Sequence, residues 1–201
     1  MEITATMVKE LRQKTGAPMM DCKKALAETG GDFEKAITYL RQKSLATVSK
    51  KAHRVTAEGI IASYIHPGSK LGVMLEINCE SDFVARSNEF QEFTKNVTMH
   101  IAALNPLCIS REDVTPEDID KEREIYTSQA KDSGKPEKIW DKIVSGRMDK
   151  YFAEVCLLEQ TYIKDDTLTV QEVLNELIAK LGENISIRRF TRYQLGEDLS
   201  A

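Results

Sequence analysis

The residue types that could carry chemistry converge on one short stretch, Cys79-Glu80-Ser81-Asp82-Phe83. Cys79 lies next to a carboxylate and is the one candidate for a reactive thiol. It also ends an apolar strand, however, and a cysteine in that position is most often a buried hydrophobic side chain. We therefore expect no catalytic residue in this chain. A thiol enzyme that uses Cys79 remains a third hypothesis, behind the two that are given below.

Other signatures of catalysis, metal binding or phosphate binding are missing from the sequence. There is no HExxH, GxSxG, GxGxxG or GxxxxGK[ST] pattern, and the three histidines have no nucleophilic partner nearby in sequence. The cysteines are far apart, without a CxxC pair or a histidine at ligand spacing, as expected for reduced thiols of a cytosolic protein. The four cysteines are Cys22, Cys79, Cys108 and Cys156. We therefore predict no metal and no cofactor.

An acid–aromatic pair, Asp82 and Phe83, is the most informative feature of the central stretch. Ser81 and Asp82 favour a turn or a helix start, because their short side chains accept hydrogen bonds from free backbone N–H groups. Phe83 and Val84 are apolar residues beside that turn. They either fold back into the core as a staple or protrude as an anchor for a partner, and composition alone does not choose between the two.

The elements around this stretch predict an α+β fold. An alternating apolar strand precedes it (Leu71 to Ile77), and an amphipathic helix follows it (Asn88 to Leu104). We expect a small N-terminal three-helix module, then a core with an antiparallel sheet, and a helical arm. The predicted divisions are 1–44 for the module, 45–57 for a basic linker, 58–115 and 161–196 for the core, 116–160 for the arm, and 197–201 for a tail. The weak apolar periodicity of the linker leaves open whether it is helical.

Two further exposed positions are candidate contacts. Met19 and Met20 are adjacent at the start of a predicted helix, so their side chains point about 100° apart and cannot both face one small core. Core packing is the simpler interpretation of either residue, and an adaptable contact surface is the alternative. His66 lies in the turn of a predicted hairpin, where a histidine is more often only solvated than functional.

The composition limits the classes of partner. The chain has 201 residues, 41% of them hydrophobic and 30% charged, with a net charge of −4. A mildly acidic chain argues against a general nucleic-acid binder, which usually has a basic face. No apolar run approaches the length needed to span a membrane. We therefore expect a soluble, cytoplasmic protein that binds neither nucleic acid nor membrane.

Three stretches resemble the bacterial translation elongation factor Ts family. They are Thr15-Gly16-Ala17-Pro18-Met19-Met20-Asp21-Cys22-Lys23-Lys24-Ala25-Leu26, Leu75-Glu76-Ile77-Asn78-Cys79-Glu80-Ser81-Asp82-Phe83-Val84-Ala85-Arg86, and Gly182-Glu183-Asn184-Ile185-Ser186-Ile187-Arg188-Arg189-Phe190. The family usually has threonine where this chain has Ser81, and both residues keep a capping hydroxyl. The length resembles the short forms, which carry one copy of a core unit that longer forms duplicate.

The resemblance implies a guanine-nucleotide exchange factor for elongation factor Tu, in its GDP-bound and nucleotide-free forms, and not an enzyme. It implies that Ser81, Asp82, Phe83 and Val84 disturb the magnesium and phosphate site of that GTPase. Further contacts would come from Arg12, Met19, Met20 and His66. By analogy with short forms it also implies a homodimer, with the arm or nearby strands as its interface. The alternative function is a generic protein-binding adaptor built on a ubiquitin-associated-like module, which would leave Asp82 and Phe83 unexplained.

Overall fold

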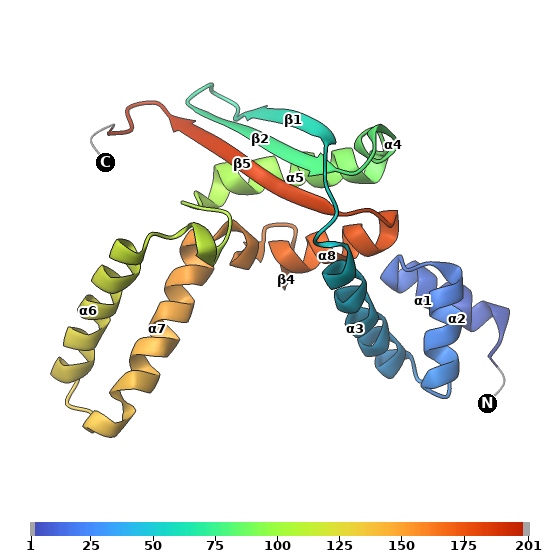
Figure 1. Cartoon of the computed structure of the whole chain (residues 1–201), viewed down its shortest axis with the longest axis horizontal. Helices are drawn as coiled ribbons and strands as arrows, with labels where there is room; N and C mark the ends of the chain where they lie inside the picture. Colours follow the sequence, from blue (N-terminus) through green and yellow to red (C-terminus); the bar gives the residue numbers. More distant parts are fainter. Residues whose placement is uncertain (1–2, 199–201) are drawn as a thin grey trace. The chain divides into compact units, whose positions relative to one another are not determined.

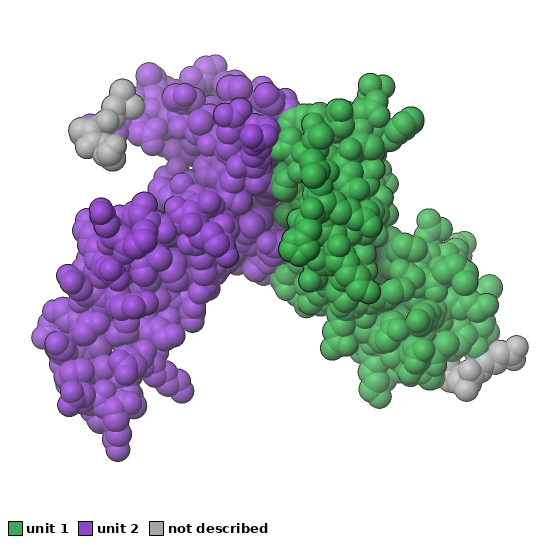
Figure 2. Space-filling model, in the orientation of Figure 1, with its two compact units in different colours: residues 1–60, 77–91, 172–186 green, residues 61–76, 92–171, 187–201 purple. Residues whose placement is uncertain are grey.

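The structure is a computed structural model that describes residues 3–198, and Figure 1 shows its helices and strands in chain order. The chain forms two compact units, coloured separately in Figure 2. The first unit contains the chain up to Ile60, together with Ile77–Gln91 and Glu172–Ser186; the second contains Ile61–Glu76, Glu92–Gln171 and the chain from Ile187 onward. These boundaries differ from those of the predicted domains, and that division stays a prediction. Residues 199–201 of the predicted tail lie outside the described residues.

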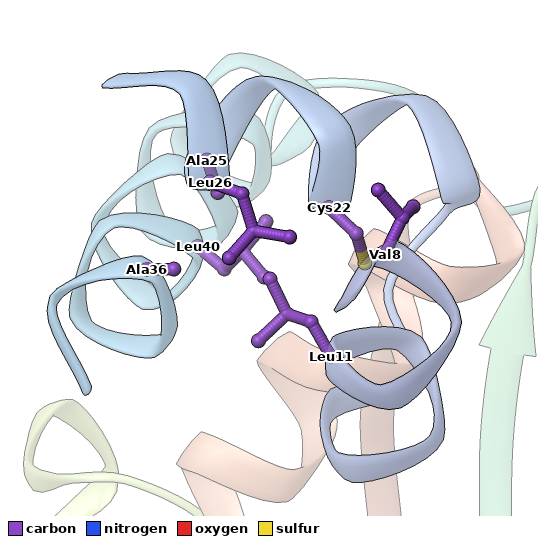
Figure 3. Packing of buried hydrophobic residues seen from close by; sticks show 7 residues of the cluster. All are labelled: Val8, Leu11, Cys22, Ala25, Leu26, Ala36 and Leu40. Atoms are coloured by element: carbon purple, nitrogen blue, oxygen red, sulfur yellow. The ribbon is translucent and has the colours of Figure 1, made fainter. Parts of the chain in front are cut away.

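Three helices form the N-terminal part of the chain, as predicted: α1 (Ala5–Thr15), α2 (Met19–Glu28) and α3 (Phe33–Lys51). The Thr4 hydroxyl accepts a hydrogen bond from the Met7 N–H (3.3 Å), and Asp32 caps α3 in the same way. Gly16 ends α1 in the left-handed conformation that favours glycine. Figure 3 shows the small core that the helices share, made of Val8, Leu11, Cys22, Ala25, Leu26, Ala36 and Leu40.

Helix α3 continues through the first part of the expected linker, for which the sequence left a helical conformation open. Its second half contacts α8 (Val170–Leu181) and the residue after it, at positions that belong to the same compact unit. The Ser44 hydroxyl donates to the Asn175 carbonyl (3.3 Å), and the Lys51 ammonium donates to the Gly182 carbonyl. Residues 45–51 have weak apolar periodicity, so contacts distant in sequence support a helix that local pattern does not predict.

A three-stranded sheet has the strand order β1-β2-β5, formed by β1 (Glu58–Ile65), β2 (Leu71–Cys79) and β5 (Ile185–Gln194). The predicted hairpin of β1 and β2 is confirmed, and the His66 N–H donates to the Leu71 carbonyl where it turns (2.9 Å). Strand β5 runs antiparallel to β2, since the Leu195 N–H just beyond its end donates to the Lys70 carbonyl just before β2 (2.8 Å). The predicted α+β fold is confirmed.

Burial along β2 alternates as the sequence predicts. Val73, Leu75, Ile77 and Cys79 are buried, while Met74 is exposed. Helix α5 (Asn88–Leu104) is amphipathic as predicted, with a buried stripe of Phe90, Phe93, Val97 and Ile101. Leu104, which continues the same spacing at the end of the helix, is exposed. Short helix α4 (Asp82–Ala85) lies between β2 and α5 in the chain.

The predicted helical arm consists of α6 (Pro116–Asp132) and α7 (Trp140–Val155), which lie side by side (Figure 1). Ala130, Val144, Met148, Phe152 and Cys156 form its buried cluster. A small hairpin follows, made of β3 (Thr161–Tyr162) and β4 (Asp165–Thr169). The sequence does not predict β4, because its polar start lacks the alternation of a half-buried strand.

Candidate functional site

The acid–aromatic pair lies in a tight turn between β2 and α4. Ser81 is the N-cap of α4: its backbone is extended, and its hydroxyl accepts a hydrogen bond from the Val84 N–H (3.4 Å). The Arg86 N–H donates to the Asp82 carbonyl (3.1 Å) as the helix ends. The predicted preference of Ser81 and Asp82 for a helix start is therefore confirmed, and the four residues Asp82–Ala85 form a single helical turn.

Two glutamates join this turn to the segment between α8 and β5, because the side chain of each accepts hydrogen bonds from the other segment. Glu183 accepts three hydrogen bonds: from the Glu80 N–H (3.1 Å), from the Ser81 N–H (3.0 Å) and from the Ser81 hydroxyl (2.5 Å). In the opposite direction, Glu80 accepts a hydrogen bond from the Asn184 N–H (2.6 Å). Carboxylates bind N–H and O–H donors more strongly than neutral acceptors do, so these reciprocal hydrogen bonds fix the backbone just before the acid–aromatic pair.

Residues after α3 join the same network. The Asn184 amide donates to the carbonyls of Ala52 (3.4 Å) and Arg54 (2.9 Å). Arg54 also lies 3.5 Å from the Glu80 carboxylate. The turn is thus held by hydrogen bonds to two segments distant in sequence, and all of these residues belong to the first compact unit.

Phe83 and Val84 differ in their exposure to solvent. Phe83 is 84% exposed, whereas Val84 is 9% exposed and lies among the buried residues with Ala85. The alternation follows from one helical turn, which directs neighbouring side chains to different sides. Of the two possibilities left open by the sequence, Phe83 protrudes and Val84 folds into the core. Val84 therefore supports the turn from beneath.

Asp82 is half-exposed beside Phe83. Its carboxylate forms an ion pair with Arg86 one helical turn later (3.0 Å), and both side chains remain in contact with solvent. Such exposed pairs contribute little to stability, typically about 0–1 kcal/mol. A partner can therefore compete for this carboxylate at small cost.

Cys79 does not have the properties of a catalytic thiol. Its side chain is fully buried, and its thiol donates a hydrogen bond to the Ser81 carbonyl (3.1 Å). Burial, with the nearby Glu183 carboxylate, raises the pKa of Cys79 above its ordinary value. A raised pKa disfavours the reactive thiolate, so the geometry argues against the thiol-enzyme hypothesis.

The N-terminal candidates all lie on the surface of the three-helix part. Met19 is 44% exposed and Met20 is 71% exposed, and Arg12 is also exposed. Neither methionine is a member of the buried core in Figure 3. The structure thus favours the contact-surface interpretation of this pair over core packing.

His66 is exposed in the β1–β2 turn, as predicted. Its Nδ1 atom is hydrogen-bonded to the Tyr64 hydroxyl (2.9 Å), which orients the ring. His100, in helix α5, is fully buried. The Ile163 N–H donates to its Nδ1 atom (3.2 Å), so the proton is on Nε2, which donates to the Gln160 side chain (2.9 Å).

Sequence reasoning did not identify four residues that hold the acid–aromatic turn, which are Glu80, Glu183, Asn184 and Arg54. Glu80, Glu183 and Asn184 lie within the stretches that carry the family resemblance, but no role follows from local pattern. About one hundred residues separate Glu80 from Glu183 and Asn184, and only the pairing of β2 with β5 brings them together. Among residues 3–198, no group of three or more metal-ligating side chains comes together, and no helix is long and apolar enough to cross a membrane.

A family model described as elongation factor TS matches residues 1–197. The chain belongs to the elongation factor Ts family. Similar relatives are elongation factor Ts of Geobacter metallireducens, 59% identical over the full chain and 93% of the relative's length, and that of Desulforamulus reducens, 58% identical over 98% and 91%. Elongation factor Ts of Heliobacterium modesticaldum is 55% identical over 98% of this chain.

Membership of the elongation factor Ts family establishes a role in translation elongation. The resemblance seen in the sequence is thereby confirmed. The second and third of the stretches that carry the resemblance meet at the base of the acid–aromatic turn, where the side chains of Glu80 and Glu183 each accept hydrogen bonds from the other stretch.

Proposed function

We propose that this protein is a guanine-nucleotide exchange factor for elongation factor Tu, and that it promotes GDP release without any bond chemistry. The protein binds the GDP-bound GTPase, weakens its hold on the nucleotide, and remains bound to the nucleotide-free form. It acts in the cytoplasm, where translation takes place. The observation that carries this proposal is Phe83, an aromatic side chain that is 84% exposed on a turn with a fixed backbone.

Phe83 acts as the anchor of the contact. An exposed phenylalanine gains about 1.5–3 kcal/mol when a partner buries it fully, and a turn that is already ordered loses little conformational entropy on binding. The hydrogen bonds of Glu183 supply that order. The energy of burial is therefore available for moving an element of the partner.

Asp82 brings negative charge to the same place. In a P-loop GTPase, Mg²⁺ and backbone N–H groups hold the nucleotide phosphates. A wedge that displaces the elements around the Mg²⁺ ion weakens nucleotide binding. Linkage then requires GDP to weaken the binding of this protein by the same factor, so incoming nucleotide releases it from the GTPase.

The remaining candidates form secondary contacts. Arg12, Met19 and Met20 lie on the surface of the three-helix part, where the two flexible thioether side chains suit an adaptable contact with the GTPase domain. His66 offers an exposed ring in the hairpin turn. Ser81 and Val84 support the wedge from below instead of leading the contact, because the Ser81 hydroxyl is engaged by Glu183 and Val84 is buried.

We also propose that two copies of the chain form a homodimer. Strands β1, β2 and β5 carry large exposed apolar side chains, among them Ile61, Ile65, Met74 and Tyr193. Exposed apolar area on one sheet is typical of an association surface. Light scattering should give twice the mass of one chain, and Ile61→Glu should shift it to the mass of a single chain. A single-chain mass for the wild-type protein would refute the dimer.

Release of a fluorescent GDP analogue from elongation factor Tu tests the exchange function. The wild-type protein should accelerate release, and Phe83→Ala should lose about 2 kcal/mol of the contact, or roughly 30-fold in the rate at a subsaturating concentration. Leu107→Ala, which truncates another exposed apolar side chain, is the matched control and should retain the rate. If the wild-type protein leaves release unchanged, the exchange function is refuted and the adaptor alternative becomes the better hypothesis.

A further inference from the structure

Two thiols lie next to each other at the base of the helical arm. Cys108 is in the segment between α5 and α6, and Cys156 directly follows α7. Their sulfur atoms are 3.6 Å apart, and the Cys108 thiol donates toward the Cys156 sulfur. Cys156 is fully buried, while Cys108 is partly exposed.

The backbone holds the two residues in register. Cys108 and Cys156 form an isolated parallel β-bridge. The Cys108 N–H donates to the Val155 carbonyl (3.2 Å), and the Leu157 N–H donates to the Cys108 carbonyl (2.9 Å). Paired backbone segments lie about 4.7–4.9 Å apart, which places the two α-carbons within the range of about 4.4–6.8 Å found for disulfides. Closing the sulfurs to about 2.05 Å then requires side-chain rotation and no backbone movement.

The position of the pair gives a bond between them a structural consequence. All of α6 and α7 lies between the two cysteines, which are 48 positions apart in sequence. Both contact the apolar cluster of the arm, which includes Val144, Met148 and Phe152. A covalent link would close the arm at its base and limit its unfolding, since it removes conformational freedom from the unfolded chain.

We propose that Cys108 and Cys156 are an oxidisable pair that forms an intramolecular disulfide when the chain reacts with a hydroperoxide. The Cys108 thiolate attacks one peroxide oxygen, the O–O bond breaks, and the leaving oxygen is protonated, so Cys108 becomes a sulfenic acid. The Cys156 sulfur then attacks the Cys108 sulfur. The S–S bond forms as the S–O bond breaks, and the oxygen leaves with the Cys156 proton as water. With hydrogen peroxide, two thiols and one peroxide yield one disulfide and two waters. A dithiol reductant reverses the reaction.

The roles of the two residues follow from their exposure. Cys108 reacts first because the oxidant can reach it, and buried Cys156 resolves the sulfenic acid. Burial raises the pKa of Cys108, and burial with the Cys108 contact raises the pKa of Cys156 to about 12. Asp113 and Glu159 raise the pKa of Cys108 further. Glu159 also raises the pKa of Cys156, and Arg111 lowers it. Oxidation is therefore slow at neutral pH and becomes faster as the pH rises.

Hydrogen peroxide treatment of the full chain at pH 8.5, followed by denaturation and alkylation, tests the pair. The alkylatable thiols should fall from four to two. Trypsin should release residues 96–111 joined to residues 151–164, as a species that dithiothreitol separates. The arm in the oxidised chain should resist a second protease more than the arm in the reduced chain.

Matched variants distinguish this pair from the other thiols. Cys108→Ser and Cys156→Ser should each abolish the joined peptide, while the Cys22→Ser/Cys79→Ser double variant should retain it. The wild-type experiment is decisive without the variants. The proposal is overturned if Cys108 accumulates as a sulfinic acid while Cys156 stays alkylatable, or if the cross-link joins two chains.

Discussion

Glu183 should control both the stability of the acid–aromatic turn and its activity, although it lies about one hundred residues away in sequence. Replacing it with alanine removes the acceptor of three hydrogen bonds, at 2.5, 3.0 and 3.1 Å. A hydrogen bond to a charged group contributes about 1.5–3 kcal/mol. The three do not add in full, because water can reach these partly buried donors. We therefore expect Glu183→Ala to lower the free energy of unfolding by about 2–4 kcal/mol.

The activity of this variant should fall more than its stability alone explains. Without denaturant, at a temperature where Glu183→Ala is still folded, the Ser81–Phe83 backbone lacks the hydrogen bonds that held it in position. Binding then has to order the turn again, so the rate of GDP release from elongation factor Tu should drop at least about tenfold, equivalent to about 1.4 kcal/mol. The rate of GDP release with Glu183→Gln should lie between those of the wild-type protein and Glu183→Ala. The glutamine amide keeps one acceptor oxygen but places a donor against the backbone N–H groups.

Urea unfolding followed by circular dichroism gives the stability, and fluorescent GDP release gives the activity. Glu124→Ala, which removes an exposed glutamate from α6, is the matched control and should change neither. If Glu183→Ala unfolds at the same urea concentration as the wild-type protein and releases GDP at the same rate, the reasoning about the turn is wrong. A loss of stability with an unchanged exchange rate would show that Phe83 does not need a braced turn.

Three other predictions concern the fold. Gly59→Ala should destabilise the protein by at least about 3 kcal/mol, because the added Cβ would lie 2.2 Å from the Ile77 carbonyl oxygen and Gly59 has a φ of +148°. Gly146→Ala in α7 should instead stabilise the protein by about 0.5–1 kcal/mol, because its Cβ would meet nothing within 4 Å. Urea unfolding of both variants tests this pair. Val84→Ala should lower the free energy of unfolding by about 1–3 kcal/mol, whereas that of Phe83→Ala should stay within about 0.5 kcal/mol of the wild-type value, since only Val84 is buried. Equal losses in the two variants would contradict the observed burial. Burial lowers the pKa of His100 in the folded state, so protonation favours the unfolded chain. Stability should therefore fall as the pH drops below about 6.5, the pKa of histidine in the unfolded chain. The urea midpoint of His100→Asn should depend less on pH between pH 7.5 and 5.5 than that of the wild-type protein. An equally steep dependence in that variant would assign the effect to other groups.

The sequence by itself determined the fold class, most of the elements and the family. Those features depend on residues close together in the chain: the Thr4 and Asp32 caps, the alternation of β2 and the apolar stripe of α5 all have a period that can be counted locally. The three recognised stretches likewise need no knowledge of contacts. Local pattern was insufficient for the second half of α3, because the contacts that support it come from α8 and the residue after it, more than one hundred positions away. It was also insufficient for β4, whose polar start lacks the alternation of a half-buried strand although its partner β3 directly precedes it.

Only the tertiary structure decided how the central turn works. Phe83 and Val84 are both apolar and adjacent, so composition cannot tell which one protrudes; their exposure depends on the orientation of one helical turn, which the pairing of Ser81 with Glu183 sets. The same holds for Cys108 and Cys156, which read as scattered thiols in the sequence and lie 3.6 Å apart in the fold. Both arrangements join residues about 50 to 100 positions apart. No local periodicity encodes such contacts, because they form only when strands and helices close large loops of the chain.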